Sequence, residues 1–173
     1  MNYGQPDSDE VLTAYHEAGH AVIAYALGGT VHSIQLGGEA DDWLPERFGE
    51  CRIHWKGVSS RRPPTQWQRR REVLTILAGP VAEMIYSGQP YHPAHFGPAK
   101  GDWQLAWERV ERIVSSPLQR TRYLEEITLE LYWRMRSDDL WAAIGAVADE
   151  LLAHELLEED QLSETLGFWM RES

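Results

Sequence analysis

The sequence predicts a mainly α fold with a small sheet of two or three strands beside its first helix. Apolar residues recur at spacings of three and four through most of the 173 residues, the period of helices that bury one face. Only two short segments, residues 30–36 and 50–55, read as strands. The length suits a single domain over residues 1–173, with enough chain to bury a substantial core.

The first helix is expected from about Asp9 to Leu27. Its buried face is formed by residues at spacings of three and four, namely Val11, Tyr15, Ala18 and Val22. Asp7 followed three residues later by Glu10 resembles a capping box. Gly28-Gly29 is expected to end the helix.

Two strands follow this helix. Residues 30–36 end at Gly37-Gly38, residues 39–49 form a polar acidic loop, and residues 50–55 end at Lys56-Gly57. His32 and His54 lie on the strands, where a histidine is more often a surface residue than a metal ligand.

Residues 65–87 are expected to be helical, with core spacing in two rows: Val73, Leu77 and Met84, and Leu74, Val81 and Ile85. Gly79-Pro80 should interrupt this segment, as a kink or as a break into two short helices, because proline removes one backbone hydrogen bond and clashes with the preceding turn.

The second half of the chain is expected to be helical after an irregular loop over residues 88–101. Asp102 opens a helix that runs through Val114. Ser116-Pro117-Leu118-Gln119 starts the next helix, with serine as the cap, proline at the first position and glutamine at the third; it runs to about Arg136. Ser137 caps another through His154, and a short helix covers about residues 158–166.

The motif His16-Glu17-Ala18-Gly19-His20 predicts a zinc site on the first helix. Positions i and i+4 stack one turn apart, so both imidazoles can reach one tetrahedral metal. Glu17 can then reach the attacking water, take its proton and pass it to a leaving amine. The motif supplies two ligands, His16 and His20, and a general base.

Several side chains compete for the third ligand position. Glu83 is the only charge between Val73 and Ser87, and needs the metal, a ligand histidine or an arginine as its partner. Asp102 at a helix start is a metal ligand or a plain cap. His92 and His95 lie in the loop before it and fit either a site contact or no role at all.

The composition of the chain limits the classes of binding partner and the location that are expected. A net charge of −11 argues against nucleic acid, and the arginines at 61–62 and 69–71 are better read as a solvated helix start or partner contact. Cys51 is the only cysteine, so the chain forms no internal disulfide. The longest uncharged apolar stretch of the first helix is too short to span a membrane, and the first eight residues do not resemble a signal segment. A soluble, cytoplasmic protein is therefore expected.

Four segments resemble, in order, the peptidase domain of the FtsH-type proteases, which are membrane-anchored ATP-dependent zinc proteases. They are TAYHEAGHA (13–21), LAGPVAEMIYSG (77–88), KGDWQLA (100–106) and VADELLAHELL (147–157). The resemblance covers about residues 9–166 and implies a zincin-like helical metallopeptidase domain. It implies His16, His20 and Asp102 as zinc ligands and Glu17 as the base, and leaves Glu83 a supporting or packing role.

The chain also departs from that family. It has no Gly-x-x-x-x-Gly-Lys-Ser/Thr motif and no stretch like the family's membrane anchors. Pro80 stands where the family usually has another residue, and segments 39–49 and 115–117 differ, so the local helix path, the rim of the site and the ring assembly are not carried over.

Two functions follow as expectations. The first is a soluble, ATP-independent zinc peptidase that cleaves unfolded or flexible polypeptides, with a separate ATPase partner and a homo-oligomer as open alternatives. The second is a non-catalytic relative that acts as a metal-containing binding or scaffolding module. A fourth protein ligand on the metal would favour the module, whereas three ligands beside Glu17 favour the enzyme.

Overall fold

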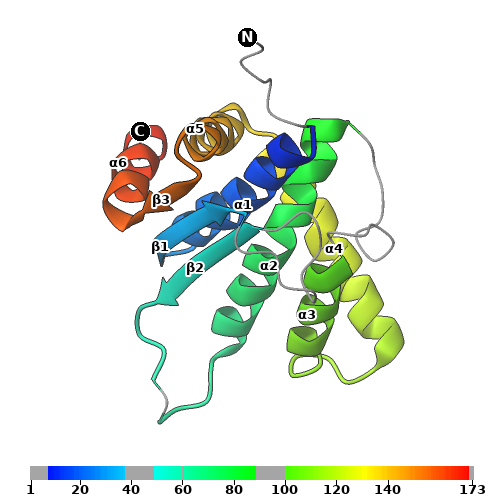
Figure 1. Cartoon of the computed structure of the whole chain (residues 1–173). Helices are drawn as coiled ribbons and strands as arrows, with labels where there is room; N and C mark the ends of the chain where they lie inside the picture. The colour runs from blue at the N-terminus through cyan, green and yellow to red at the C-terminus, as the bar shows by residue number, and fades with distance from the viewer. Residues whose placement is uncertain (1–7, 38–48, 60, 89–99, 172–173) are drawn as a thin grey trace.

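The computed structural model describes residues 8–37, 49–59, 61–88 and 100–171, and it is mainly helical with one small antiparallel sheet (Figure 1). This confirms the fold class expected from the sequence. In chain order the elements are α1 (Ser8–Ala26), β1 (Gly29–Leu36), β2 (Gly49–Trp55), α2 (Gln66–Ser87), α3 (Lys100–Val110), α4 (Pro117–Met135), α5 (Asp138–His154), β3 (Leu156–Glu158) and α6 (Glu159–Trp169).

The sheet has three strands in the order β2-β1-β3, with both pairs antiparallel. At its centre, Ile34 pairs with Cys51 on one side and with Leu157 on the other. The first two strands agree with the expected segments to within one residue. The third lies in a segment expected to separate two helices, and it is too short for its alternation to stand out in the sequence.

Helix α1 is central to the packing. Figure 1 shows the sheet and α6 on one side of it and α2, followed by α3 and α4, on the other. Its buried alanines, Ala14, Ala18, Ala21 and Ala24, are fully enclosed. Small side chains bring two helix backbones close together, and the α1–α2 contact depends on this.

Gly19 marks the closest approach of α1 to α2. A Cβ atom at this position would lie 2.6 Å from the Ala78 carbonyl oxygen and 2.8 Å from the Ala82 Cβ. Neither neighbour can rotate away, because one is backbone and the other is the first atom of a buried side chain. Only glycine therefore permits this spacing.

The expected interruption at Gly79-Pro80 is not a break, because α2 is one helix with Pro80 inside it. Proline keeps a backbone φ that suits a helix and removes a single hydrogen bond. The residues around it are buried against α1, so tertiary packing compensates for that loss. The helix starts with a capping box between Thr65 and Gln68 and ends at Gly88, whose φ of 67° is left-handed.

Helix boundaries elsewhere differ modestly from expectation. Helix α3 starts two residues before Asp102 and ends at Val110, four residues before the expected end. Helix α4 has Ser116 at the cap position and Pro117 at its start, but the serine side chain makes no capping hydrogen bond. Arg120 holds this turn instead, since its guanidinium donates to the carbonyl oxygens of Val114 and Ser115.

No helix in the described part of the chain combines the length and apolar character needed to cross a membrane. The proposed cap at Asp7 and the acidic loop over residues 39–48 lie outside the described residues.

We predict that Gly19→Ala lowers the free energy of unfolding by about 1–3 kcal/mol, because the new methyl group forces α1 away from α2. Urea unfolding followed by circular dichroism measures the change. Gly145→Ala in α5 is the matched control: among the described residues its Cβ would meet nothing closer than the Tyr15 hydroxyl at 3.8 Å, so the better helix former should stabilise the protein by about 0.5–1 kcal/mol. Equal effects of the two substitutions would contradict the close-approach explanation.

Candidate metal centre

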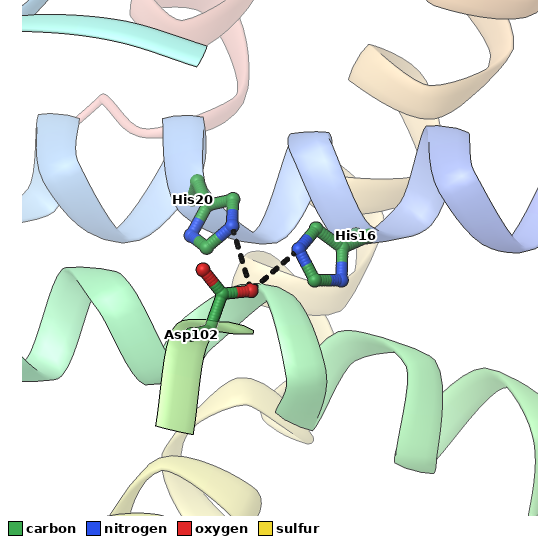
Figure 2. Close-up of side chains that lie close together, drawn as sticks. All are labelled: His16, His20 and Asp102. Atoms are coloured by element: carbon green, nitrogen blue, oxygen red, sulfur yellow. Dashed lines mark ion pairs between the residues drawn. The ribbon is translucent and has the colours of Figure 1, made fainter. Parts of the chain in front are cut away.

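Three side chains expected as metal ligands converge in the structure. His16 and His20 project from α1 one turn apart, and Asp102 reaches them from the first turn of α3 (Figure 2). The Asp102 Oδ2 lies 2.9 Å from His16 Nε2 and 3.7 Å from His20 Nε2. One ligand atom from each residue can be chosen so that all lie within 4.8 Å of one another.

The second nitrogen of each histidine is held by α2. His20 Nδ1 lies 2.8 Å from the Thr75 carbonyl oxygen, and His16 Nδ1 lies 2.6 Å from Glu83 Oε1. A carbonyl and a carboxylate only accept hydrogen bonds, so both Nδ1 atoms are the donors. In the neutral imidazoles the lone pairs are therefore on the Nε2 atoms, which face Asp102. This is the support that metal-ligating histidines ordinarily have.

These contacts come from one stripe of α2. Thr75, Gly79 and Glu83 are spaced by four, so they lie above one another on the face toward α1. Gly79 sits against the imidazoles: a Cβ there would lie 2.4 Å from His20 Nε2 and 2.8 Å from His16 Cδ2. The absence of a side chain at this position is what leaves room for both rings.

Glu17 lies beside this cluster and is nearly inaccessible, at 5% exposure. Its carboxylate is placed against Gly49 at the start of β2, where a Cβ would approach Glu17 Oε1 to 2.4 Å. Burial raises the pKa of Glu17, and the nearby carboxylates of Asp102 and Glu83 raise it further, against the opposing effect of the two histidines. A carboxylate with a raised pKa is a better proton acceptor, as a general base requires.

His16 and Asp102 form a strongly coupled pair. Burial lowers the pKa of His16, but the hydrogen bonds to Asp102 and Glu83 outweigh it and raise the pKa to about 10. For Asp102, burial raises the pKa, yet the hydrogen bond to His16 and the charges of both histidines lower it overall. The carboxylates thus hold a positive charge at His16, and a bound cation would have to displace that proton.

The donor set fits zinc. Two imidazole nitrogens and one carboxylate oxygen form a typical three-ligand catalytic zinc site, which leaves one position for water or substrate. The ligand side chains are 11%, 12% and 22% exposed for His16, His20 and Asp102, so the centre is largely shielded but still reachable. In the described part of the chain, these three residues form the candidate metal cluster.

A cleft of about 380 Å³ opens onto this centre. Its walls come from four elements: α1 with His16, Glu17 and His20, the inner side of β2, the middle of α2, and the start of α3. Cys51 of β2 lines it as a free thiol. Burial raises the pKa of this thiol, and Glu17 and Glu50 add to the effect, so the thiol stays protonated.

The other residues that the sequence offered for the metal site differ in where the structure places them. Glu83 is fully buried and its carboxylate contacts His16, so it holds a candidate ligand in place and is not itself part of the candidate cluster. His32 and His54 lie on the exposed side of the sheet, where His32 pairs with Glu159, as expected of surface residues. His92 and His95 lie outside the described residues.

Sequence reasoning missed Thr75, Gly79 and Gly49. Thr75 contributes a backbone carbonyl, to which side-chain identity gives no clue. Gly79 had a usable signal, because it lies four residues before Glu83 on a helix with a lone buried charge. Gly49 was expected only as the last residue of a loop.

Comparison with protein-family models and with curated proteins found no match for this chain. The likeness to FtsH-type peptidase domains therefore stays a prediction from the four segments.

We predict that Gly79→Ala weakens zinc binding about 10- to 100-fold, the loss typical when the support of metal ligands is disturbed. The new methyl group must push His20 and His16 out of position. Competition with a chromophoric chelator measures the affinity. Gly101→Ala is the matched control, since a Cβ there meets no atom of the described residues within 4 Å although Gly101 precedes Asp102 and lines the same cleft. Unchanged affinity in Gly79→Ala would contradict the assigned positions of the imidazoles.

We also predict that zinc binding at pH 7 releases about one proton from His16, because its raised pKa keeps the ligand nitrogen protonated in the metal-free protein. Affinity should then fall about tenfold for each unit that the pH decreases below about 10. Calorimetry in buffers of different ionisation enthalpy counts the protons. Glu17→Gln removes the neighbouring carboxyl group, whose pKa is also raised, and should preserve the release; binding without proton release would exclude His16 as a ligand.

Proposed function

We propose that this protein is a zinc-dependent metallopeptidase that acts on unfolded or flexible polypeptides. The observation that carries the proposal is the convergence of His16, His20 and Asp102 at a cleft in which the buried carboxylate of Glu17 stands beside them. A site that only needed metal for structure would have no use for a proton acceptor there.

The chain's own residues supply the acid–base chemistry and the positioning. Bound zinc would polarise the substrate carbonyl and lower the pKa of water towards neutrality. Glu17 takes the proton from the attacking water and then delivers it to the leaving amine. With zinc bound, Glu83 and the Thr75 carbonyl would hold the remaining ring protons of His16 and His20 on Nδ1, so that both Nε2 atoms serve as ligands.

Strand β2 is well placed to hold the substrate. It is an edge of the sheet as described, and Gly49, Glu50, Cys51 and Ile53 line the cleft. An extended polypeptide can pair with such an edge through its main chain. Because that pairing requires an extended backbone, it selects unfolded or flexible segments over folded domains.

In this proposal, the given chain does not itself bind or hydrolyse ATP, since its sequence contains no phosphate-binding loop motif. A separate ATPase that unfolds substrates is compatible with it. The proposal of a relationship to FtsH-type peptidase domains rests on the four sequence segments, and three residues that the resemblance implies as ligands, His16, His20 and Asp102, lie close together in the structure.

We predict that Glu17→Gln retains zinc and the fold but lowers kcat for cleavage of an unfolded protein, such as casein, about 100- to 10,000-fold, the usual contribution of a general base. Glutamine has nearly the same shape, so only the proton acceptor is lost. Cleavage is followed with a fluorescently labelled substrate, and metal content by elemental analysis.

Two controls accompany this variant. A chelator should abolish wild-type cleavage, and added zinc should restore it. Undiminished cleavage by Glu17→Gln would refute the mechanism. A zinc-loaded wild type that cleaves nothing and carries a fourth protein ligand would favour the non-catalytic module instead.

A further inference from the structure

The connection between β2 and α2 is the most basic part of the chain. Residues 56–71 contain six of the 16 lysines and arginines and no aspartate or glutamate, although the whole chain has a net charge of −11. Figure 1 shows this connection as a long loop that extends beyond the body of the fold. A concentration of one charge on a projecting segment creates a local field that attracts groups of the opposite charge.

Both ends of this loop are held by the fold. At its base, the guanidinium of the buried Arg71 stacks over the ring of Trp55, with Cζ 4.3 Å from the ring centroid, and so joins the start of α2 to the end of β2. Thr65 caps α2, and Pro63 and Pro64 restrict the backbone just before it. A segment that is already restrained loses less conformational entropy when it binds a partner.

The cations of the loop are available to a partner. Lys56, Arg61 and Arg62 are exposed, Arg69 is half-buried, and none of the four forms an ion pair with a residue that the structure describes. Arg70 is different, because it pairs with Glu130 of α4. Two apolar side chains of the same segment, Val58 and Trp67, are 50% and 53% exposed. The loop therefore presents positive charge together with apolar surface.

This loop continues directly from the strand that is proposed to hold the substrate. Gly49, at the first position of β2, lies against Glu17 and lines the cleft, and Ile53 also lines it. The strand is seven residues long and ends at Trp55, one residue before Lys56. At about 3.3 Å per residue, the loop begins about 20 Å along the strand from Gly49. A polypeptide paired with β2 would therefore lead from the metal centre towards the loop.

We propose that this basic loop, which consists of Lys56, Arg61, Arg62, Arg69 and the exposed Trp67, binds an acidic segment of the polypeptide substrate. This inference rests on the proposed peptidase function and on pairing along β2. The acidic residues lie about five to eight positions from the scissile bond, on one side of it. Nucleic acids and anionic membranes are also negatively charged, but neither can add a strand to the sheet edge that leads to the loop.

The test measures binding by the zinc-loaded Glu17→Gln protein, so that the peptide is not cleaved. Peptides of about sixteen residues of alanine, leucine and serine, labelled at the centre, carry either four glutamates or four glutamines at one end, and binding is followed by fluorescence anisotropy. One pair has this block at the N-terminus and the other at the C-terminus. In about 50 mM salt we expect the glutamate form to bind about 5- to 20-fold more tightly for one placement only, because several exposed ion pairs add small contributions. About 0.5 M salt should remove most of this advantage.

A double variant in the same background locates the effect. Arg61→Gln combined with Arg62→Gln should lower the glutamate-to-glutamine ratio to less than about twofold; both side chains are exposed, so the fold should not change. Arg112→Gln combined with Arg122→Gln is the matched control. It removes the same two charges from exposed positions outside the loop and should keep the ratio.

Three results would overturn the role of the loop: equal binding of the two forms, an equal advantage at both ends of the peptide, and an advantage that the loop variant retains. A single-stranded oligonucleotide and vesicles of anionic lipid are titrated in parallel. If either binds more tightly than the acidic peptide and depends on Arg61 and Arg62, the loop does not serve polypeptides.

The outcomes also separate this inference from the proposed function. Wild-type cleavage of casein together with equal binding of both forms leaves the peptidase proposal standing and removes this one. Acid-dependent binding at one end, without any cleavage by the zinc-loaded wild type, supports the docking of acidic segments and removes the peptidase, as the non-catalytic module would require.

Discussion

The close packing of α1 against α2, in which the two helix backbones almost touch, is the constraint on which the rest of the structure depends. Gly19 lets the two helices approach, and Gly79 leaves space for the imidazoles between them. At this spacing a main-chain carbonyl, that of Thr75, and the short reach of Glu83 are enough to fix both rings. A wider gap filled by larger side chains would hold the same histidines without orienting them.

This close packing also governs the electrostatics. Glu17, Glu83 and Asp102 bring three carboxylates into a space that is largely closed to water, and burying them is unfavourable unless positive charge is near. The histidines supply that charge as long as they are protonated, and a divalent cation would supply it more completely. The site therefore needs positive charge at its centre, and a zinc ion that replaced the histidine proton would stabilise the fold as well.

Some parts of this arrangement could be predicted from the sequence because they follow from helical spacing, whereas others depend on tertiary packing and could not. The spacing of His16 and His20 specifies one helix face, so the placement of both imidazoles together, with Glu17 beside them, followed directly. Asp102 is distant in sequence, and only the resemblance singled it out over Glu83. The continuity of α2 through Pro80 is set by tertiary packing, and the roles of Thr75 and Gly49 arise from backbone geometry; neither leaves a pattern in the order of side chains. The acidic loop, His92 and His95 belong to parts of the chain beyond the described residues.

The position of the short strand β3 in the chain determines when the sheet can be completed. It pairs with the central strand β1, although the two segments stand near opposite ends of the described chain. Contacts between such distant segments form late, because a long loop must close before they are made. During synthesis α1 therefore emerges from the ribosome before the other described elements, while β3, the last strand of the sheet beside it, appears only after all of α5. A nascent chain that carries the two histidines thus lacks the third strand of the sheet flanking them until residues 156–158 have been made.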